Sequence, residues 1–434
     1  MVSLLLSLVP DTSLASDEKA AMEAVERGNA SLKNGQVDAA IIAFTDAIRL
    51  KPTCADAYYG RGDAYRTKGD LDKAIADLTS TIRLNVKDAS AYGIRGTVYE
   101  LKGDFDRAIV DYTEAIRLDP SWVNGYWNRG QAYLEKGDYT RAIADFTEAI
   151  RLNPKDADAY HGRGVAFKKM GEVGKAIADF TEALRINPKM PDTCVARAFA
   201  YEEKGDLDKS MADFTEAIRL VPTETQFYYN RGYTYLQRGQ VDKSLADFAE
   251  AIRFDPKNSN AYFGHGQACA QKGDWDKAIA SYTEAIRIKP AFADLYLDRG
   301  AAYFEAGNLD KATDDYFEAV RLAPKDASVY YGRSQFYMKL RDWDKALLDV
   351  EEAIRLNPNF ADAYGVRGAI YMAKGDWDKA IADCTEEIRL NPKRGMAYYG
   401  RGLAYKNKGE KAKADADFAE AKKLGYQPKK LKKE

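Results

Sequence analysis

Histidine is scarce in this sequence, and that scarcity limits the metal chemistry open to the chain. Only His161 and His265 occur among 434 residues, and neither has a ligand partner at metal-site spacing. Cysteine is almost as rare, with four scattered residues and no CxxC pair: Cys54, Cys194, Cys269 and Cys384. The sequence therefore indicates neither a zinc site nor a disulfide framework, and we expect no bound metal or cofactor.

Long apolar runs and an excess of one charge are also missing. No stretch of 18 apolar residues occurs, so the sequence predicts no transmembrane helix. The 65 basic and 67 acidic side chains leave a net charge of −2. That balance gives no general attraction for nucleic acid or for an anionic membrane surface, and we expect no nucleic-acid partner.

The sequence does contain a repeat of constant length. A glycine recurs at steps of 34 residues, and Ala198 and Ser334 hold its place twice. The glycines are Gly28, Gly62, Gly96, Gly130, Gly164, Gly232, Gly266, Gly300, Gly368 and Gly402. Twelve repeats without insertion then occupy residues 21–428, leaving an N-terminal segment, 1–20, and a basic C-terminal tail, 429–434. Positions below are counted from 1 to 34 within each repeat.

Each repeat predicts two helices. Residues 55–69 of the second repeat are an example of helix A, and residues 274–290 of the eighth repeat are an example of helix B. Apolar and aromatic residues recur in both at spacings of three and four, which is typical of an amphipathic helix. Glycine at position 15 is expected to end helix A in eleven repeats, and Arg341 is the exception.

The ends of helix B carry their own signals. An Asp or Asn often follows the position-15 glycine, as at Asp70, Asp104 and Asn308, and suits the capping of helix B. Proline at position 32 is expected to end helix B in ten repeats, with Val86 and Tyr426 as the exceptions.

The fourth repeat shows every residue of the recurring pattern. It has a large residue at 4, Gly at 8, Tyr at 11, Ala at 20, an aromatic residue at 24, Ala at 27 and Pro at 32. These are Tyr126, Gly130, Tyr133, Ala142, Phe146, Ala149 and Pro154. This pattern resembles the tetratricopeptide repeat, and the resemblance covers 408 of the 434 residues. It implies an all-α fold, an α-solenoid of helical hairpins wound as a right-handed superhelix. Stacking is obligatory, because no single hairpin buries its apolar face alone.

Position 7 departs from the family pattern, since it is Arg in eleven repeats. A basic ladder for nucleic acid is one interpretation, and a pair with the Asp found at position 23 in ten repeats is the other. In the eighth repeat both charges disappear together, as His265 and Ser281. We therefore favour pairing between helices A and B, although Arg27 faces Ala43 and has no such partner.

The candidate binding residues lie where the repeats differ. Positions 2, 5, 9, 12 and 13 form one stripe along helix A, which in the family resembles the inner, concave surface that holds peptides. The alternative is that these side chains only pack between repeats. The partner-binding candidates are Trp127, Phe199, Tyr229, Tyr233, Phe263, Gln267, Phe304, Tyr331 and Gln335.

The sequence thus favours a scaffold or adaptor that binds a peptide or helical segment of a protein partner in the concave groove. The alternative is self-assembly into a homo-oligomer through terminal or convex surfaces. We expect no enzyme, because no insertion interrupts the repeats to hold an active site. Cys194, Cys269 and Cys384 fall on core positions and are expected to be buried packing thiols.

The ends give weaker signals. Residues 1–10 are largely apolar and precede small residues, which resembles a signal peptide, but no Lys or Arg stands in front of them. We expect the cytoplasm, with export through this incomplete signal as the alternative. In the last repeat, Asp415 stands where most repeats have Ile or Leu, and is expected to face solvent.

Overall fold

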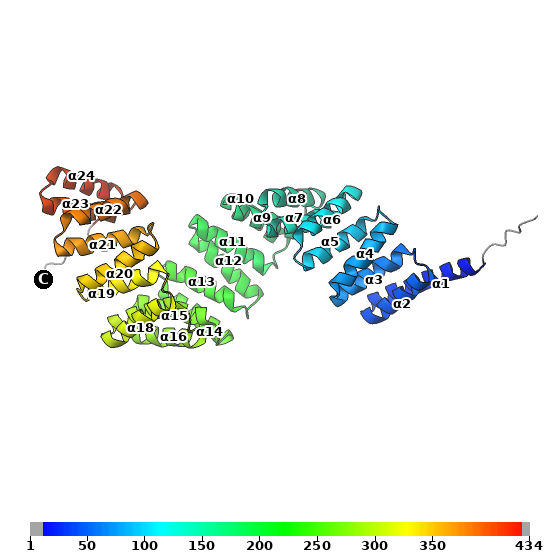
Figure 1. Cartoon of the computed structure of the whole chain (residues 1–434), viewed down its shortest axis with the longest axis horizontal. Helices are drawn as coiled ribbons and strands as arrows, with labels where there is room; N and C mark the ends of the chain where they lie inside the picture. Colours follow the sequence, from blue (N-terminus) through cyan, green and yellow to red (C-terminus); the bar gives the residue numbers. More distant parts are fainter. Residues whose placement is uncertain (1–11, 428–434) are drawn as a thin grey trace, which may run out of the picture. The chain divides into compact units, whose positions relative to one another are not determined.

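The structure is a computed structural model that describes residues 12–427, and every regular element in that range is an α-helix. The 24 helices alternate as helix A and helix B of twelve successive hairpins (Figure 1). The predicted all-α fold of helical hairpins is therefore confirmed. Within residues 12–427 no helix is both long and apolar enough to cross a membrane.

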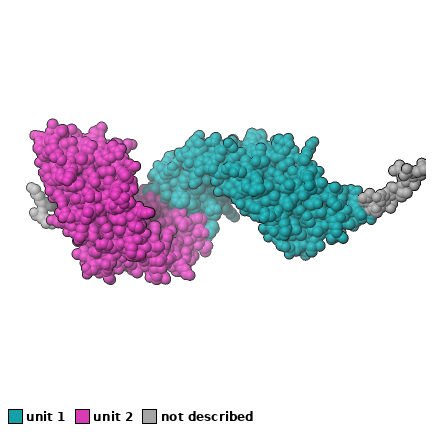
Figure 2. Space-filling view, viewed as in Figure 1, with its two compact units in different colours: residues 1–222 teal, residues 223–434 magenta. Residues whose placement is uncertain are grey.

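The hairpins fall into two compact units, divided after Pro222 (Figure 2). The first unit contains α1 (Thr12–Lys33), α2 (Val37–Leu50), α3 (Ala55–Lys68), α4 (Leu71–Leu84), α5 (Ala89–Leu101), α6 (Phe105–Leu118), α7 (Val123–Glu135), α8 (Tyr139–Leu152), α9 (Ala157–Lys169), α10 (Val173–Ile186), α11 (Pro191–Lys204) and α12 (Leu207–Leu220).

The second unit begins at Thr223 and repeats the same arrangement. It contains α13 (Thr225–Gln237), α14 (Val241–Phe254), α15 (Ser259–Lys272), α16 (Trp275–Ile288), α17 (Ala293–Glu305), α18 (Leu309–Leu322), α19 (Ala327–Lys339), α20 (Trp343–Leu356), α21 (Ala361–Lys374), α22 (Trp377–Leu390), α23 (Gly395–Lys408) and α24 (Lys411–Lys423).

Within each unit the A helices lie closer together than the B helices. Inside a unit, each helix contacts the next one in the chain, and the A helix of one repeat also contacts the A helix of the following repeat. Neighbouring B helices make no comparable contact anywhere in residues 12–427. The A helices therefore line the inner side of each stack, which is the side expected to bind a partner.

The glycine at position 8 lets the two helices of a hairpin approach each other. A Cβ atom added to Gly164 would lie 2.7 Å from the ring of Phe180, and one added to Gly266 would lie 2.5 Å from Tyr282. Both aromatic residues come from position 24 of helix B and are buried. A side chain at position 8 would displace the aromatic ring that fills the centre of the hairpin.

The predicted end of helix A is confirmed. The position-15 glycines have a positive φ, as at Gly307 with 82°, which is the left-handed conformation that glycine adopts without strain. Arg341 takes the same conformation with a φ of 60°, and it is the one non-glycine residue with a positive φ in the described part of the chain. The backbone of this turn is thus kept even where the residue type is unfavourable.

The predictions for helix B need two corrections. Asp104 and Asn308 do accept a backbone N–H bond as helix caps, at 3.1 and 3.2 Å. Asp70 does not cap α4, because its carboxylate pairs with Lys73 at 2.8 Å instead. Helix α4 also ends at Leu84, two residues before Val86, as other B helices end two residues before their proline. Proline is therefore compatible with this helix end but is not required for it.

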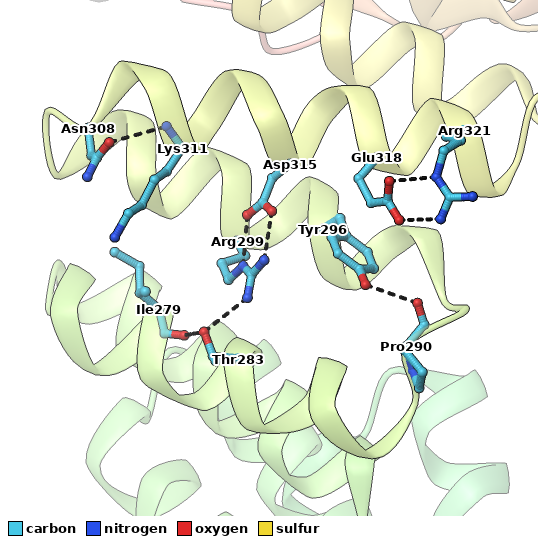
Figure 3. Close-up of polar contacts among 10 residues, drawn as sticks. All are labelled: Ile279, Thr283, Pro290, Tyr296, Arg299, Asn308, Lys311, Asp315, Glu318 and Arg321. Atoms are coloured by element: carbon cyan, nitrogen blue, oxygen red, sulfur yellow. Dashed lines mark hydrogen bonds and ion pairs between the residues drawn. The ribbon is translucent and has the colours of Figure 1, made fainter.

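The position-32 proline has a second role that the sequence did not reveal. The hydroxyl of Tyr296 donates to the carbonyl of Pro290 at 3.1 Å, which joins helix A of one repeat to the end of the preceding repeat (Figure 3). Tyr330 and Pro324 make the same bond at 3.2 Å. The bonded carbonyls belong to the turn that follows helix B, two residues beyond the end of the helix.

The predicted Arg–Asp pairing is confirmed. In the ninth repeat, Arg299 donates two hydrogen bonds to Asp315, from Nε at 2.8 Å and from Nη2 at 2.7 Å (Figure 3). The ten pairs are 61–77, 95–111, 129–145, 163–179, 197–213, 231–247, 299–315, 333–349, 367–383 and 401–417. In the eighth repeat, His265 and Ser281 replace the charged pair with one hydrogen bond of 2.8 Å. Arg27 is exposed.

The arginine also reaches the preceding repeat. Nη1 of Arg299 donates to Thr283 at 3.2 Å, and Thr283 lies on helix B of the repeat before (Figure 3). Arg129 makes the equivalent bond to Thr113 at 3.0 Å. One guanidinium thus fixes helix A against its own helix B and against the neighbouring repeat, which gives the recurring arginine a structural role.

The structure also tests the predicted core cysteines and parts of the two ends. Cys194, Cys269 and Cys384 are buried as expected, and Asp415 is exposed. Helix α1 starts at Thr12, so residues 12–20 extend helix A of the first repeat. The apolar run of residues 1–10 and the basic tail of residues 429–434 lie outside the described residues.

Candidate binding groove

The nine candidate residues lie on the A helices of both units. Helix α7 carries Trp127 and α11 carries Phe199 in the first unit. In the second unit they are Tyr229 and Tyr233 on α13, Phe263 and Gln267 on α15, Phe304 on α17, and Tyr331 and Gln335 on α19. Because these helices line the inner side of each stack, the residues share a face within each unit.

Several of the aromatic candidates pack within the repeats. The ring of Tyr229 lies 5.8 Å from Phe248, and the ring of Phe263 lies 5.9 Å from Tyr282. Tyr331 lies 4.8 Å from Phe360. Each of the three candidates is half-buried. Packing between helices therefore accounts for much of their surface, and only the remainder faces the groove.

Two aromatic candidates keep a larger free surface. Tyr233 is 43% exposed and Phe199 is 37% exposed. Phe199 still packs edge-on against Phe214, at 5.5 Å, and the Lys168 ammonium lies 5.1 Å from its ring. Tyr233 lies beside Tyr229, with 6.5 Å between ring centres. Tyr233 is the more exposed of the two. Its ring can bury a large area against a partner while few side-chain rotamers are lost.

Tyr233 opens onto a cavity of about 550 Å³ between α13, α15 and α17. Gln267 lines the same cavity, so the structure brings two of the nine candidates together. Leu236, Trp275, Asp298 and Glu305 complete its main walls. This group of residues, Tyr233, Leu236, Gln267, Trp275, Asp298 and Glu305, is called the central pocket below.

Two small side chains open the central pocket. Position 12 carries a large side chain in eleven repeats, such as Leu236 or Phe304, but Ala270 in the eighth. Position 9 carries Tyr233 and Gln267 in the seventh and eighth repeats, but Ala301 in the ninth. Both alanines line the cavity. The cavity is therefore a consequence of where the repeat loses bulk along its inner stripe.

One of the two acids of the central pocket is Asp298, from position 6 of α17. It accepts a hydrogen bond from Nε2 of Gln267 at 3.2 Å. Burial raises the pKa of Asp298, and the nearby Asp294 adds to the rise. The adjacent Arg299 is bound to Asp315 instead. No basic side chain of residues 12–427 forms an ion pair with Asp298.

A second cavity, of about 260 Å³, lies between α19 and α23 and is lined by the candidates Tyr331 and Gln335. It also contains Glu387, which is 4% exposed and stands at position 27, where ten repeats have Ala. Burial raises the pKa of Glu387 to about 7. The Nε of Arg394 lies 3.1 Å from the Glu387 carboxylate.

Gly365 makes room for Glu387. A Cβ atom added to Gly365 would lie 2.8 Å from the Glu387 carboxyl group. Arg394 also pairs with Asp362 on α21, so the guanidinium bridges the two acids. Glu387, which breaks the run of alanines at position 27, is thus accommodated by Gly365 and paired with Arg394.

In the first unit the two candidates line separate cavities. Phe199 lines one of about 370 Å³ together with His161, and Trp127 lines one of about 350 Å³ together with Asp156. Nδ1 of His161 lies 2.9 Å from the Thr193 hydroxyl, and burial lowers the pKa of His161. The candidates Tyr229, Phe263 and Phe304 line none of these four cavities.

The described residues offer neither a metal cluster nor a thiolate to these cavities. Across residues 12–427, no group of three or more His, Cys, Asp or Glu side chains is arranged to hold a metal ion. Burial raises the pKa of Cys194 to about 11 and of Cys384 to about 12, so both stay protonated thiols at neutral pH. The central pocket instead offers an aromatic wall, an amide and a carboxylate.

Sequence reasoning missed Trp275, Asp298, Glu387 and Arg394. Glu387 had a clear signal, because it breaks a column of alanines. Asp298 had none, because position 6 holds many residue types along the chain. Trp275 lies at the start of helix B, outside the inner stripe of helix A, and enters the pocket only through the packing of α15 on α16.

Comparison with known families identifies repeats over most of the chain. Models described as "TPR repeat" match residues 96–137, 130–171 and 266–307. Models described as "Tetratricopeptide repeat" match residues 25–85, 157–190, 191–223, 225–258, 293–326, 331–394 and 397–424. No curated protein matches the sequence.

Solved structures share the fold. Yeast Tom70 is similar at 19% identity with a TM-score of 0.53, over 94% of this chain and 92% of Tom70. Cut9, in a complex with Hcn1, is similar at 17% identity with a TM-score of 0.44, over 92% of each chain. YrrB, described as a TPR protein with an unusual peptide-binding site, is similar at 24% identity with a TM-score of 0.37, over 42% of this chain and 95% of YrrB.

Proposed function

Because the chain belongs to the tetratricopeptide repeat family, we propose that it is a protein-interaction scaffold that holds a peptide or helical segment of a partner against its A helices. The family and the fold support the general role. The inner stripe of the second unit supports the specific binding mode, since an exposed aromatic residue, Tyr233, and a cavity of about 550 Å³ coincide there.

The central pocket is the observation that carries this proposal. It combines an exposed aromatic residue, Tyr233, with a cavity of about 550 Å³ and a few convergent polar groups. Ligand sites are typically concave, largely apolar and supplied with a small number of placed polar groups. Tyrosine and tryptophan at the centre of such a site are the residue types that contribute most to binding.

The proposal is for recognition and not for catalysis. Asp298 and Glu387 line different cavities, and neither cavity contains a serine or histidine side chain. The one cysteine that lines them, Cys384, is a protonated thiol at neutral pH because its pKa is raised to about 12. A nucleophile with a neighbouring general base is thus absent from both.

Self-assembly is the second candidate, and the exposed apolar residues give it less support. Ile42, Val110 and Leu348 are strongly exposed on helix B, but they lie in the first, third and tenth repeats. Single exposed apolar residues are normal on soluble proteins and form no patch. We expect light scattering with gel filtration to give the mass of one chain, and a stable oligomer would instead favour self-assembly.

A peptide selection tests the binding proposal. The full chain is immobilised and a phage-displayed library of random peptides is panned against it. We expect the selected peptides to lose about tenfold or more in affinity on Tyr233→Ala, which truncates the pocket wall, and on Ala270→Met, which fills the cavity. Leu348→Ala, an exposed apolar truncation on helix B of the same unit, is the matched control and should bind normally. If the peptides bind Tyr233→Ala and Ala270→Met as tightly as they bind the wild-type chain, binding in the pocket is refuted.

A further inference from the structure

Asp298 is a half-buried acid without the arginine partner that the buried acids at position 23 have. The carboxylate of Asp315, on the neighbouring helix B, receives two hydrogen bonds from Arg299. Asp298 precedes Arg299 directly in the chain, yet it receives only the amide of Gln267. A carboxylate that is partly removed from water and has no cation beside it is less favourable than a paired one, so Asp298 can gain from a cation that a ligand supplies.

The walls around Asp298 suit the stem and head of a basic side chain. Tyr233, Leu236 and Trp275 present aromatic and aliphatic surface along the cavity. Methylene groups of lysine and arginine pack on such surface, and their charged heads are attracted to aromatic faces. The side chains that line the pocket include two acids, Asp298 and Glu305, and no lysine or arginine.

The two acids differ in how free they are to bind a ligand. Glu305 is at the rim and pairs with Lys339 from α19, at 2.5 Å. The Lys339 ammonium also lies 4.9 Å from the ring of Phe304. Glu305 is therefore already neutralised, whereas Asp298 is not. The negative charge available to a ligand lies in the interior of the pocket and not at its rim.

We propose that the central pocket takes a basic side chain of the partner, arginine in preference to lysine, with Asp298 as its counter-ion and Tyr233 and Trp275 as its walls. This inference rests on the proposed function and adds the chemistry of the partner. Arginine is preferred because its planar guanidinium both stacks on aromatic rings and forms paired hydrogen bonds with a carboxylate. The partner segment thus carries arginine at the position that meets α17.

Peptides selected from the random library on the wild-type chain provide the probe. We expect them to share an arginine or lysine at one position. Replacing that residue by citrulline, which is neutral and nearly isosteric with arginine, should weaken binding to the wild-type chain by roughly ten- to a hundredfold. The same replacement should have little effect on Asp298→Asn, because the charge partner is already gone. Asp310→Asn, which removes an exposed acid on α18, is the matched control and should behave as wild type.

The outcomes separate this inference from the proposed function. Two outcomes would overturn the inference and leave the proposed function standing. In one, the peptides need Tyr233 but share no basic residue. In the other, citrulline weakens binding to the wild-type chain and to Asp298→Asn by the same factor. Peptides that ignore both Tyr233→Ala and Ala270→Met would overturn the proposed function. A library that yields no binder to the wild-type chain would overturn both.

Discussion

Arg129 and Asp145 are joined by two parallel hydrogen bonds, Nε to Oδ2 at 2.8 Å and Nη2 to Oδ1 at 2.7 Å. The carboxylate is buried and the guanidinium is mostly so. Arg129 also donates to Thr113 of the preceding repeat at 3.0 Å. The pair is one of ten along the chain, and its geometry predicts how it responds to mutation.

Removing one partner of this pair should cost more than removing both. Arg129→Ala leaves the Asp145 charge buried without a partner, and we expect it to destabilise the protein by about 3 kcal/mol. Arg129→Ala with Asp145→Ala should cost less, because no charge is left behind. Denaturant unfolding of the single and double variants measures the coupling. Arg27→Ala, at the same position but exposed and without an Asp, is the control and should change stability by less than about 0.5 kcal/mol. Purely additive losses would contradict the pairing.

Arg341→Gly should stabilise the protein. Arg341 holds a φ of 60°, which is unfavourable for a residue with a Cβ atom by roughly 1 kcal/mol, and glycine removes that strain. The reciprocal change, Gly307→Ala, places a Cβ at the equivalent turn and should destabilise by a similar amount. Thermal unfolding of both variants measures the shift. A lower midpoint for Arg341→Gly would show that the Arg341 side chain contributes more than the strain costs.

Glu387 should make stability depend on pH. Its pKa in the folded protein is raised from 4.5 to about 7, so the folded state favours the protonated acid. The stability linked to protonation is complete below about pH 4.5 and is lost as the pH rises through about 7, by up to about 3 kcal/mol. Relative to Glu387→Gln, the wild-type chain should therefore unfold more easily at about pH 8 than at about pH 5.

The neighbouring residue provides the control for that measurement. Glu386 is half-buried and pairs with Arg389, and the hydrogen bond from Arg389 lowers its pKa. Its contribution should have the opposite sign, since it is present above the ordinary pKa of glutamate and is lost as the pH falls. Glu386→Gln should thus leave the alkaline loss of stability in place. A wild-type chain that tracks Glu387→Gln at both pH values would show that Arg394 keeps Glu387 ionised.

Asp298→Asn should stabilise the free protein at neutral pH. Burial raises the pKa of Asp298, so its ionised form is disfavoured in the folded state, whereas asparagine stays neutral and still accepts the Gln267 hydrogen bond. The gain should vanish as the pH falls below the ordinary pKa of aspartate, because the wild-type acid is then neutral as well. Unfolding midpoints at neutral and acidic pH check this. A loss of stability at neutral pH would mean that the carboxylate has a structural role.

The fold was largely predictable because the same 34-residue sequence pattern occurs twelve times. The glycine of position 8 and the aromatic residue of position 24 repeat together, so their contact could be inferred from the pattern alone. The Arg–Asp pair was predictable for the same reason, since His265 and Ser281 change together. The bond between Arg299 and Thr283 could not be predicted in this way. A threonine on a helix surface ordinarily bonds to a carbonyl of its own helix, and Thr283 does donate to the Ile279 carbonyl as well.

The candidate site was only partly predictable. The inner stripe placed Tyr233 and Gln267 together, but it could not separate aromatic residues that pack from those that stay free. Tyr331 packs on Phe360, which lies outside the stripe, near the end of the same repeat. The pocket itself depends on missing bulk at Ala270 and Ala301, and small residues give no sign of the space they leave until their neighbours are placed.

Photo-crosslinking gives the most direct test of where a partner segment binds. A photoreactive amino acid is placed at position 267 on α15, in the central pocket, and in a second protein at position 348 on α20, on the exposed face of helix B. Each is irradiated with a peptide selected on the wild-type chain. The account predicts crosslinking from position 267 and none from position 348. Crosslinking from position 348 and none from position 267 would contradict it.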